Sequence, residues 1–144
     1  MSGFERVVFD TSTLVSAALR VGSVPHQALT LALRVSEVCV SASALAELDE
    51  VLMRAKFDRY QPPQTRREFA DFMRHRATWF AVSKAQVSKV NPPSRDPKDN
   101  QFLALAQICA AAALISSDSD LLVLHPWNGV PILTPAAFLQ REGP

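Results

Sequence analysis

Glycine, cysteine and histidine are scarce in this chain of 144 residues, which has 4 glycines, 2 cysteines and 3 histidines. The sequence has no glycine-rich loop of the kind that cradles phosphate groups and no serine in a Gly-x-Ser-x-Gly elbow. His26, His75 and His125 occur singly, with no partner at ligand spacing, so we expect structural or surface roles. Nucleotide-loop and serine-hydrolase chemistry are therefore not indicated.

Paired cysteines and long apolar runs are also missing. Cys39 and Cys109 lie far apart in apolar surroundings, which favours buried thiols of a cytoplasmic protein over a disulfide framework. The longest apolar run, 108–115, is far shorter than the roughly 20 residues of a membrane span. Residues 1–6 show no positive segment followed by an apolar one, so no signal peptide is expected.

Apolar residues make up 48% of the chain, which argues against disorder. A chain of this length can bury a sizeable core, and we expect one domain spanning residues 1–144. Charge is uneven along it. Residues 1–53 carry 3 positive and 6 negative side chains, 54–95 carry 10 and 3, and 96–144 carry 2 and 5. The basic middle points to a polyanionic partner, with a solvated helix face as the alternative.

Short β-rich runs alternate with segments of helical periodicity. The pattern predicts strands at 6–9, 38–40, 79–82, 113–116 and 131–133. It predicts helices at 11–20, 26–34, 65–76, 96–112, 119–124 and 135–140, with loops at 62–63 and 83–95. A further helix is capped by Ser41 or Ser43 and runs to about residue 56. Such alternation favours a parallel sheet covered on both faces, and we expect a three-layer α/β/α sandwich with four or five strands.

Four acidic residues stand in or after apolar stretches: Asp10, Glu47, Asp99 and Asp118. Two of them follow predicted strands and two lie early in predicted helices. In open α/β sheets the ligand crevice lies beyond the carboxyl ends of the strands, so all four can meet there. Clustered carboxylates form an oxygen-only site that suits a hard divalent cation. The sequence therefore points to a Mg²⁺ or Mn²⁺ enzyme that acts on phosphate esters.

Three of the four acids also have an ordinary structural explanation, whereas Glu47, within an apolar run, is the hardest to dismiss. Asp10 is a favoured N-cap for the helix that follows it, and an acid at Asp99 suits the dipole of a helix N-terminus. Asp96, followed by a proline, is assigned mainly to capping. Either Asp118 or Asp120 is expected to cap the next helix, with Asp118 nearer to the strand.

Four segments in order resemble the PIN domain: residues 7–12 (VVFDTS), 43–48 (SALAEL), 96–106 (DPKDNQFLALA) and 114–122 (LISSDSDLL). More narrowly, they are similar to the VapC-related branch of toxin–antitoxin systems. The resemblance spans about residues 5–135. It implies an α/β/α fold and a Mg²⁺- or Mn²⁺-dependent ribonuclease whose four acids match Asp10, Glu47, Asp99 and Asp118. Asp120 would be the adjacent, assisting acid.

The sequence departs from the family pattern at two positions. Ser12 stands where the family commonly has asparagine, and Ser116 replaces a threonine. Both retain a hydroxyl that could bond a carboxylate or the scissile phosphate. The resemblance also implies an RNA substrate, an antitoxin partner and a homodimer, for which Phe69, Phe72 and Met73 are candidate contacts, although a core role suits them as well.

The basic middle of the chain supplies candidate contacts for the RNA backbone or for an acidic antitoxin segment. These are Arg54, Lys56, Arg66, Arg67, Arg74 and Arg76.

Three other functions remain open at this stage. A haloacid-dehalogenase phosphatase also begins with a strand that ends in aspartate, but it needs an acid where Ser12 stands. A receiver domain needs an acidic pair before its aspartate, which the first strand lacks. A PIN-fold protein that binds RNA or a partner without cutting is the non-enzymatic alternative.

Overall fold

The computed structural model describes residues 5–142 and contains a five-stranded, wholly parallel sheet. Residues 1–4, which belong to the segment where no signal peptide is expected, lie outside this range. The strands are β1 (Glu5–Phe9), β2 (Ser36–Val40), β3 (Thr78–Trp79), β4 (Ala113–Ile115) and β5 (Ile132–Leu133). They lie in the order β3-β2-β1-β4-β5. The predicted parallel sheet of four or five strands is confirmed.

Alternating side chains in the strands build two separate cores. Val7 and Phe9 of β1 pack into the core on one face, whereas Val8 packs into the core on the other. The same alternation holds in β4, where Leu114 points opposite to Ala113 and Ile115. Apolar residues on both sides of a strand are typical of a parallel sheet that is covered twice.

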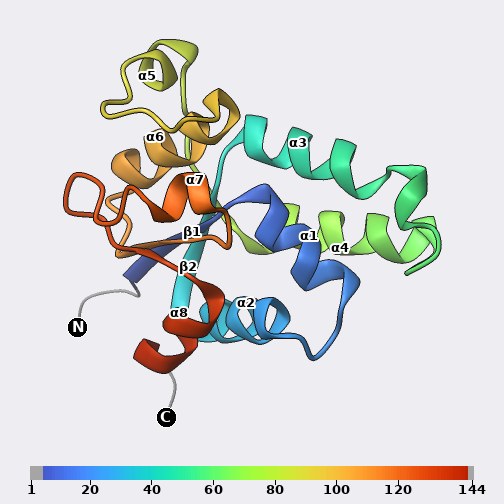
Figure 1. Cartoon of the computed structure of the whole chain (residues 1–144). Coiled ribbons are helices and arrows are strands. Elements are labelled where there is room, and N and C mark those ends of the chain that lie inside the picture. The colour runs from blue at the N-terminus through green and yellow to red at the C-terminus, as the bar shows by residue number, and fades with distance from the viewer. Residues whose placement is uncertain (1–4, 143–144) are drawn as a thin grey trace.

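Helices cover both faces, as the three-layer prediction requires. Figure 1 shows α6 and α7 on one side of the strands and α2 and α8 on the other. The first group comprises α5 (Lys84–Ser88), α6 (Asn100–Ile108) and α7 (Ser119–Leu122), with a 3₁₀ turn at Pro97–Asp99. The second comprises α1 (Thr11–Leu19), α2 (Val24–Val35) and α8 (Pro135–Glu142).

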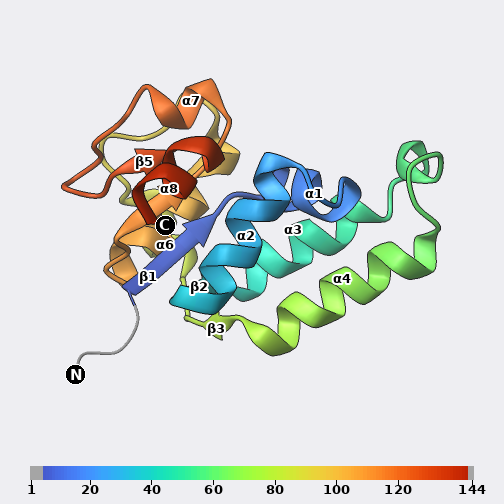
Figure 2. The same cartoon turned by 90° about the horizontal axis from the view of Figure 1, so that it is seen from below.

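Two further helices, α3 (Ala42–Leu52) and α4 (Pro63–Arg76), form an arm beside the sheet. They run side by side away from the strands in both views and are joined at the far end by a loop that contains the 3₁₀ turn Ala55–Phe57 (Figures 1 and 2). Leu48 and Leu52 of α3 and Met73 of α4 are buried and belong to the same core as α1 and α2. Met73 is therefore a core residue, whereas Phe72 is exposed.

Several predicted boundaries were wrong. The helix predicted to reach residue 56 ends at Leu52. At this end Arg66 of α4 donates hydrogen bonds to the carbonyls of Leu52 and Arg54. The helix predicted to reach residue 112 ends at Ile108. There Ala110 adopts a φ of 53°, and the N–H of Ala111 donates to the Ala106 carbonyl at 2.9 Å, which closes the helix.

Two more local assignments also differ. The predicted strand 79–82 is a two-residue strand, β3, and the predicted loop 83–95 contains the short helix α5. Ser83 and Gln86 cap α5 reciprocally, since the Ser83 N–H donates to Gln86 Oε1 at 2.7 Å and the Gln86 N–H donates to Ser83 Oγ at 3.1 Å. This Ser-x-x-Gln pattern is visible in the sequence.

The strand order places a topological switch between β1 and β4. The chain adds β2 on one side of β1 and β4 on the other, so the loops after β1 and β4 leave the sheet in different directions. A crevice at the carboxyl ends of such strands is where open α/β sheets bind ligands. In residues 5–142, no helix combines the length and apolar character that crossing a membrane requires.

Candidate active site

Asp10 lies at the carboxyl end of β1, directly beside the end of β4. Its Oδ1 accepts the backbone N–H of Thr13 at 3.1 Å, so it caps α1. Its Oδ2 accepts the hydroxyl of Ser116 at 2.6 Å, across the paired ends Phe9 and Ile115. The capping role and the site role therefore coexist, because each uses a different oxygen of one buried carboxylate.

Ser116 joins Asp10 to the next acid along the edge. This fully buried serine receives the backbone N–H of Asp118 on its hydroxyl oxygen at 2.9 Å. Asp118 Oδ1 in turn accepts the backbone N–H of Asp120 at 2.9 Å and caps α7. Ser116 therefore holds Asp10 and the turn that carries Asp118 in fixed positions.

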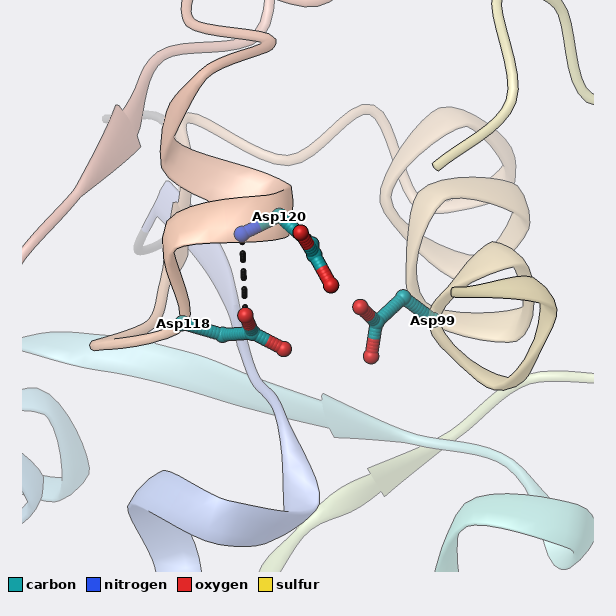
Figure 3. A group of neighbouring side chains, drawn as sticks. All are labelled: Asp99, Asp118 and Asp120. Atoms are coloured by element: carbon teal, nitrogen blue, oxygen red, sulfur yellow. Dashed lines mark hydrogen bonds between the residues drawn. The ribbon is translucent and has the colours of Figure 1, made fainter. Parts of the chain in front are cut away.

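Three acids form the compact centre of the site. One carboxylate oxygen each of Asp99, Asp118 and Asp120 lies within 4.8 Å of the others. Figure 3 shows that these side chains, which come from the start of α6 and from the turn into α7, point toward one another. Asp99 is buried, and Asp120 is also paired with the exposed Arg95 at 2.8 Å. Among the described residues, Arg95 is thus the one cation in an ion pair with this cluster, and its partner is Asp120.

Burial and like charge shift the protonation of these acids. Burial, followed by the negative charge of Asp118, raises the pKa of Asp99 from 3.8 to about 7. Burial also raises the pKa of Asp10, although the hydrogen bonds from Ser116 and Thr13 oppose the shift and Asp118 adds to it. Both shifts disfavour the ionised carboxylates, so a cation bound here would favour their ionisation.

Glu47 reaches the site from α3 and is half-buried. Its Oε1 accepts the Thr11 hydroxyl at 2.6 Å and the Gln101 side-chain amide at 3.2 Å. Thr11 follows Asp10 directly, and Gln101 is two residues after Asp99. Glu47 is thus hydrogen-bonded to the elements that carry two of the other acids, which brings it to the same edge of the sheet.

Three polar residues of this network were missed by the sequence analysis: Thr11, Ser94 and Gln101. Ser94 is buried and donates its hydroxyl to Asp99 Oδ2 at 3.3 Å. Gln101 Oε1 is buried and has no hydrogen-bond partner among residues 5–142. Adjacency to Asp10 and Asp99 was the only sequence signal for Thr11 and Gln101, and Ser94 had none.

The donor set fits a hard divalent cation. Every side chain at the centre offers oxygen. Mg²⁺ and Mn²⁺ prefer carboxylate and carbonyl oxygens, whereas thiolate and imidazole ligands select other metals. The raised pKa of Asp99 gives the same indication, since a bound cation would favour its ionised form.

A sequence profile of the PIN domain matches residues 6–120. The chain belongs to the PIN domain family. The match contains all four acids that the sequence analysis selected. A search of curated proteins found no match to the sequence.

Two solved structures have similar folds. VapC20 of Mycobacterium tuberculosis, described as a toxin that cleaves the sarcin–ricin loop, is 14% identical with a TM-score of 0.58, over 83% of this chain and 95% of the other. VapBC2 of Rickettsia felis, bound to a DNA fragment from its promoter, is 12% identical with a TM-score of 0.64, over 90% and 98% of the two chains. At such identities the likeness concerns the fold.

Ser12 of this PIN domain does not lie with the acids. Thr11 donates to Glu47, while Ser12 is exposed and faces a separate hollow beside α1. Successive residues of a helix point about 100° apart, so both could not face the carboxylates. The hydrogen bond that was expected from Ser12 is made by Thr11.

The predicted basic contacts of the PIN domain differ in accessibility. Arg66 is fully buried and donates to the carbonyls of Leu52, Arg54 and Gln61 and to the carboxylate of Asp58. It is therefore not available to RNA or to a partner, and its prediction as a contact is corrected. Its guanidinium supplies donors that the end of α3 would otherwise lack.

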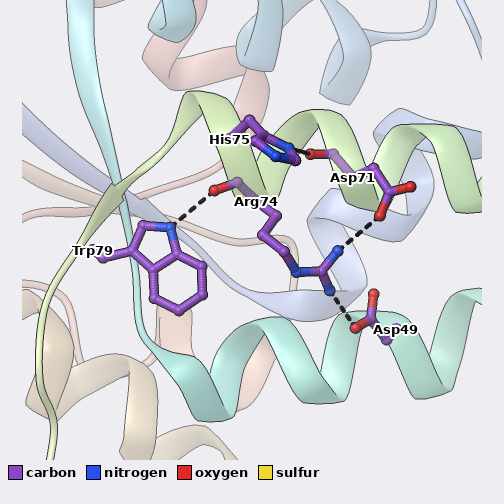
Figure 4. Close-up of polar contacts among 5 residues, drawn as sticks. All are labelled: Asp49, Asp71, Arg74, His75 and Trp79. Carbon is purple, nitrogen blue, oxygen red and sulfur yellow. Dashed lines mark hydrogen bonds and ion pairs between the residues drawn. The ribbon is translucent and has the colours of Figure 1, made fainter.

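Two other arginines of the arm are paired with acids: Arg74, which is half-buried, and Arg54, which is exposed. Figure 4 shows Arg74 between Asp71 of its own helix and Asp49 of α3, with Trp79 donating to the Arg74 carbonyl. Arg54 pairs with Glu50 at 2.9 Å. Three predicted contacts complete the set, all exposed: Lys56, Arg67 and Arg76.

Proposed function

We propose that this PIN domain is a Mg²⁺- or Mn²⁺-dependent endoribonuclease. The observation that carries the proposal is the convergence of Asp99, Asp118 and Asp120, whose oxygens lie within 4.8 Å of one another at the carboxyl edge of the sheet. Membership of the PIN family supports a nuclease, and the description of VapC20 as a toxin that cleaves the sarcin–ricin loop supports RNA as the substrate. The phosphatase alternative loses support, because it needs an acid at position 12, where the exposed Ser12 stands.

The chain's own residues would divide the work as follows. Asp10, Asp99 and Asp118 would hold the cation, with Asp120 assisting. When bound, the cation offsets the charge of the phosphodiester and lowers the pKa of bound water. Ser116 would position the site by fixing Asp10 and the backbone before Asp118, through hydrogen bonds of 2.6 and 2.9 Å.

Glu47 is proposed to orient the attacking water and to accept its proton. Both of its hydrogen bonds fall on Oε1, from Thr11 and Gln101, so the carboxylate is held while Oε2 remains for the water. The water oxygen forms a bond to phosphorus, the bond from phosphorus to the 3′ oxygen breaks, and the departing 3′ oxygen takes a proton from solvent. The products are a 5′-phosphate and a 3′-hydroxyl.

The test compares Glu47 and Asp99 with Glu50, which lies on the same helix as Glu47. Purified protein is incubated with single-stranded RNA and Mn²⁺, and the ends of the products are sequenced. Glu47→Gln and Asp99→Asn should slow cleavage by roughly 100-fold or more. Glu50→Gln, which changes an exposed acid one turn away from the site, should cleave like the parent.

Two results would contradict the proposal. One is a folded Asp99→Asn protein that cleaves as fast as the parent. The other is a parent protein that binds RNA but leaves it intact with either metal, which would favour the non-catalytic binding module.

We further propose that the protein is a cytoplasmic homodimeric toxin of a type II pair, neutralised by a cognate antitoxin. The similar fold of VapBC2, whose name describes a toxin–antitoxin pair, supports this class of partner. Phe72, exposed on α4, is the predicted dimer contact that remains at the surface. Induced expression should arrest growth, and co-expression of the small protein encoded beside it should restore growth. Normal growth under full induction would contradict the toxin role.

A further inference from the structure

A groove of about 540 Å³ runs along α1 on the side that Ser12 faces. One wall is α1, with Ser12 and Val15. The opposite wall is the end of α3 and the following loop, with Val51 and Tyr60. Figure 1 shows α1 and α3 both leading from the centre of the molecule toward this loop. We call this hollow the α1 groove.

The inner end of the α1 groove adjoins the acidic site. Ser12 directly follows Thr11, and Val51 lies four residues, about one helical turn, after Glu47. Thr11 and Glu47 are themselves hydrogen-bonded at 2.6 Å. The groove therefore begins beside the residues that carry Asp10 and Glu47, where an RNA chain that leaves the carboxylates would meet it.

The outer end of the groove combines positive charge with aromatic rings. Its lining within the described chain includes Arg20 and Lys56 and no carboxylate. The guanidiniums of Arg20 and Arg59 lie 5.9 and 5.1 Å from the centroid of the Tyr60 ring. Lys56 lies 5.1 Å from the ring of Phe57. Tyr60 is 45% exposed, so its ring is accessible from solvent.

We propose that the α1 groove binds the single-stranded RNA that flanks the scissile phosphate. An unpaired base stacks on the cluster of Tyr60 and its arginines, and Arg20 and Lys56 contact neighbouring phosphates. Aromatic rings and guanidinium planes are the surfaces on which proteins stack unpaired bases, and positive grooves follow the backbone. This inference rests on the proposed ribonuclease function and adds where its substrate lies.

The ring favours RNA over an acidic protein segment. Both partners are negative, so Arg20 and Lys56 attract either of them. The flat face of Tyr60 adds binding energy for a stacked base, whereas a carboxylate gains nothing from a π face, which carries partial negative charge. The contribution of Tyr60 therefore separates the two partners.

Binding is measured separately from cleavage, on Asp118→Asn protein in EDTA, by fluorescence anisotropy of a labelled single-stranded RNA. Tyr60→Ala should weaken binding by about 5- to 100-fold. Tyr60→Phe should bind like the parent, and Tyr60→Leu, which keeps the apolar bulk, should be as weak as Tyr60→Ala. The control is Trp79→Ala, which removes an aromatic ring of similar exposure outside the groove and should change nothing.

A base analogue gives a second readout. RNAs that carry 2-aminopurine at successive positions should show quenching at one position, and the quenching should vanish with Tyr60→Ala. Duplex RNA of the same sequence should bind more weakly and lose little on the same substitution.

The outcomes separate this inference from the proposed function. If the acids are needed for cleavage but Tyr60→Ala binds single-stranded RNA normally, the groove assignment is wrong and the nuclease stands. If binding depends on Tyr60 but no cleavage occurs with either metal, the groove stands and the nuclease fails. If Tyr60→Ala weakens binding of a glutamate-rich peptide and not of RNA, the groove belongs to an acidic protein partner and the inference is overturned.

Discussion

The acidic edge of the sheet and the α3–α4 arm use the same kinds of side chain in opposite ways. On the arm, exposed carboxylates meet guanidiniums, and Arg74 joins Asp49 to Asp71. At the edge, carboxylates meet each other, with Asp99 and Asp118 at the centre. Asp49 and Asp71 on the arm are paired with Arg74 without a ligand, whereas the carboxylates at the edge repel one another.

The difference shows which acids are structural. An exposed carboxylate paired with a guanidinium, such as Asp71, stabilises the protein a little. Asp120 differs, because it lies beside two other carboxylates as well as Arg95. Carboxylates held close to one another lower the stability of the metal-free fold and gain most from a bound cation. The neighbours of each acid therefore indicate whether its role is structural or functional. Four experiments test the contrast between the arm and the acidic edge.

The largest expected effect lies on the arm, at the buried Arg66. Arg66→Ala removes donors from three backbone carbonyls and leaves Asp58 without its partner. We expect the free energy of unfolding to fall by about 3–5 kcal/mol, measured by urea denaturation. The adjacent Arg67→Ala, an exposed change, should stay within about 0.5 kcal/mol. If both substitutions lower the free energy of unfolding equally, the contacts of the buried Arg66 do not stabilise the protein as proposed.

The next effect is the pH dependence of the metal-free protein. The pKa of Asp99 is raised from 3.8 to about 7 in the folded state, so the folded protein binds this proton more tightly than the unfolded one. The stability that comes from this carboxyl group is therefore full below pH 4 and is lost as the pH rises through about 7. Thermal unfolding in EDTA should show a Tm that declines over this range, and the decline should be smaller in Asp99→Asn. A parent and variant with parallel pH profiles would contradict it.

A third, smaller effect should have the opposite sign to most mutations. At pH 8 without metal, Asp99→Asn removes a repelling charge and should stabilise the fold by about 1 kcal/mol, or about 2–4 °C in Tm. Added Mn²⁺ should raise the Tm of the parent and leave that of the variant nearly unchanged. Destabilisation by this nearly isosteric change would indicate that Asp99 is structural.

The smallest effect returns to the arm. Asp71→Asn removes one of the two acids that flank Arg74 in an exposed ion pair. Such pairs contribute about 0–1 kcal/mol, so the Tm should fall slightly, and less so in high salt. An effect as large as that of Arg66→Ala would remove the contrast between exposed and buried charges.

Sequence periodicity was sufficient for the layers of the fold and for the edge at which the acids meet. Strand residues such as Val7 and Val8 are apolar on both faces, which is the mark of a parallel sheet covered twice. Helix ends were harder to place, because they depend on tertiary partners. The end of α3 is set by Arg66, fourteen residues after Leu52 along the chain.

The acids were predicted from their positions after strands and early in helices. The residues that hydrogen-bond to them were not predicted. Glu47 is held by Thr11 and Gln101, which are distant in sequence and become neighbours through packing. Arg66 was predicted to be an accessible cation, because helical periodicity does not reveal which polar side chain is buried. Contacts between elements, which a single sequence does not encode locally, decide both cases.

The most direct test of the central claim is calorimetric titration of Mn²⁺ into the purified protein at neutral pH. The acidic edge predicts saturable binding to the parent, loss of that binding in Asp99→Asn and in Asp118→Asn, and unchanged binding in Glu50→Gln. A parent that binds no Mn²⁺, or an Asp99→Asn protein that binds it as tightly as the parent, would contradict the assignment of this edge as a metal site.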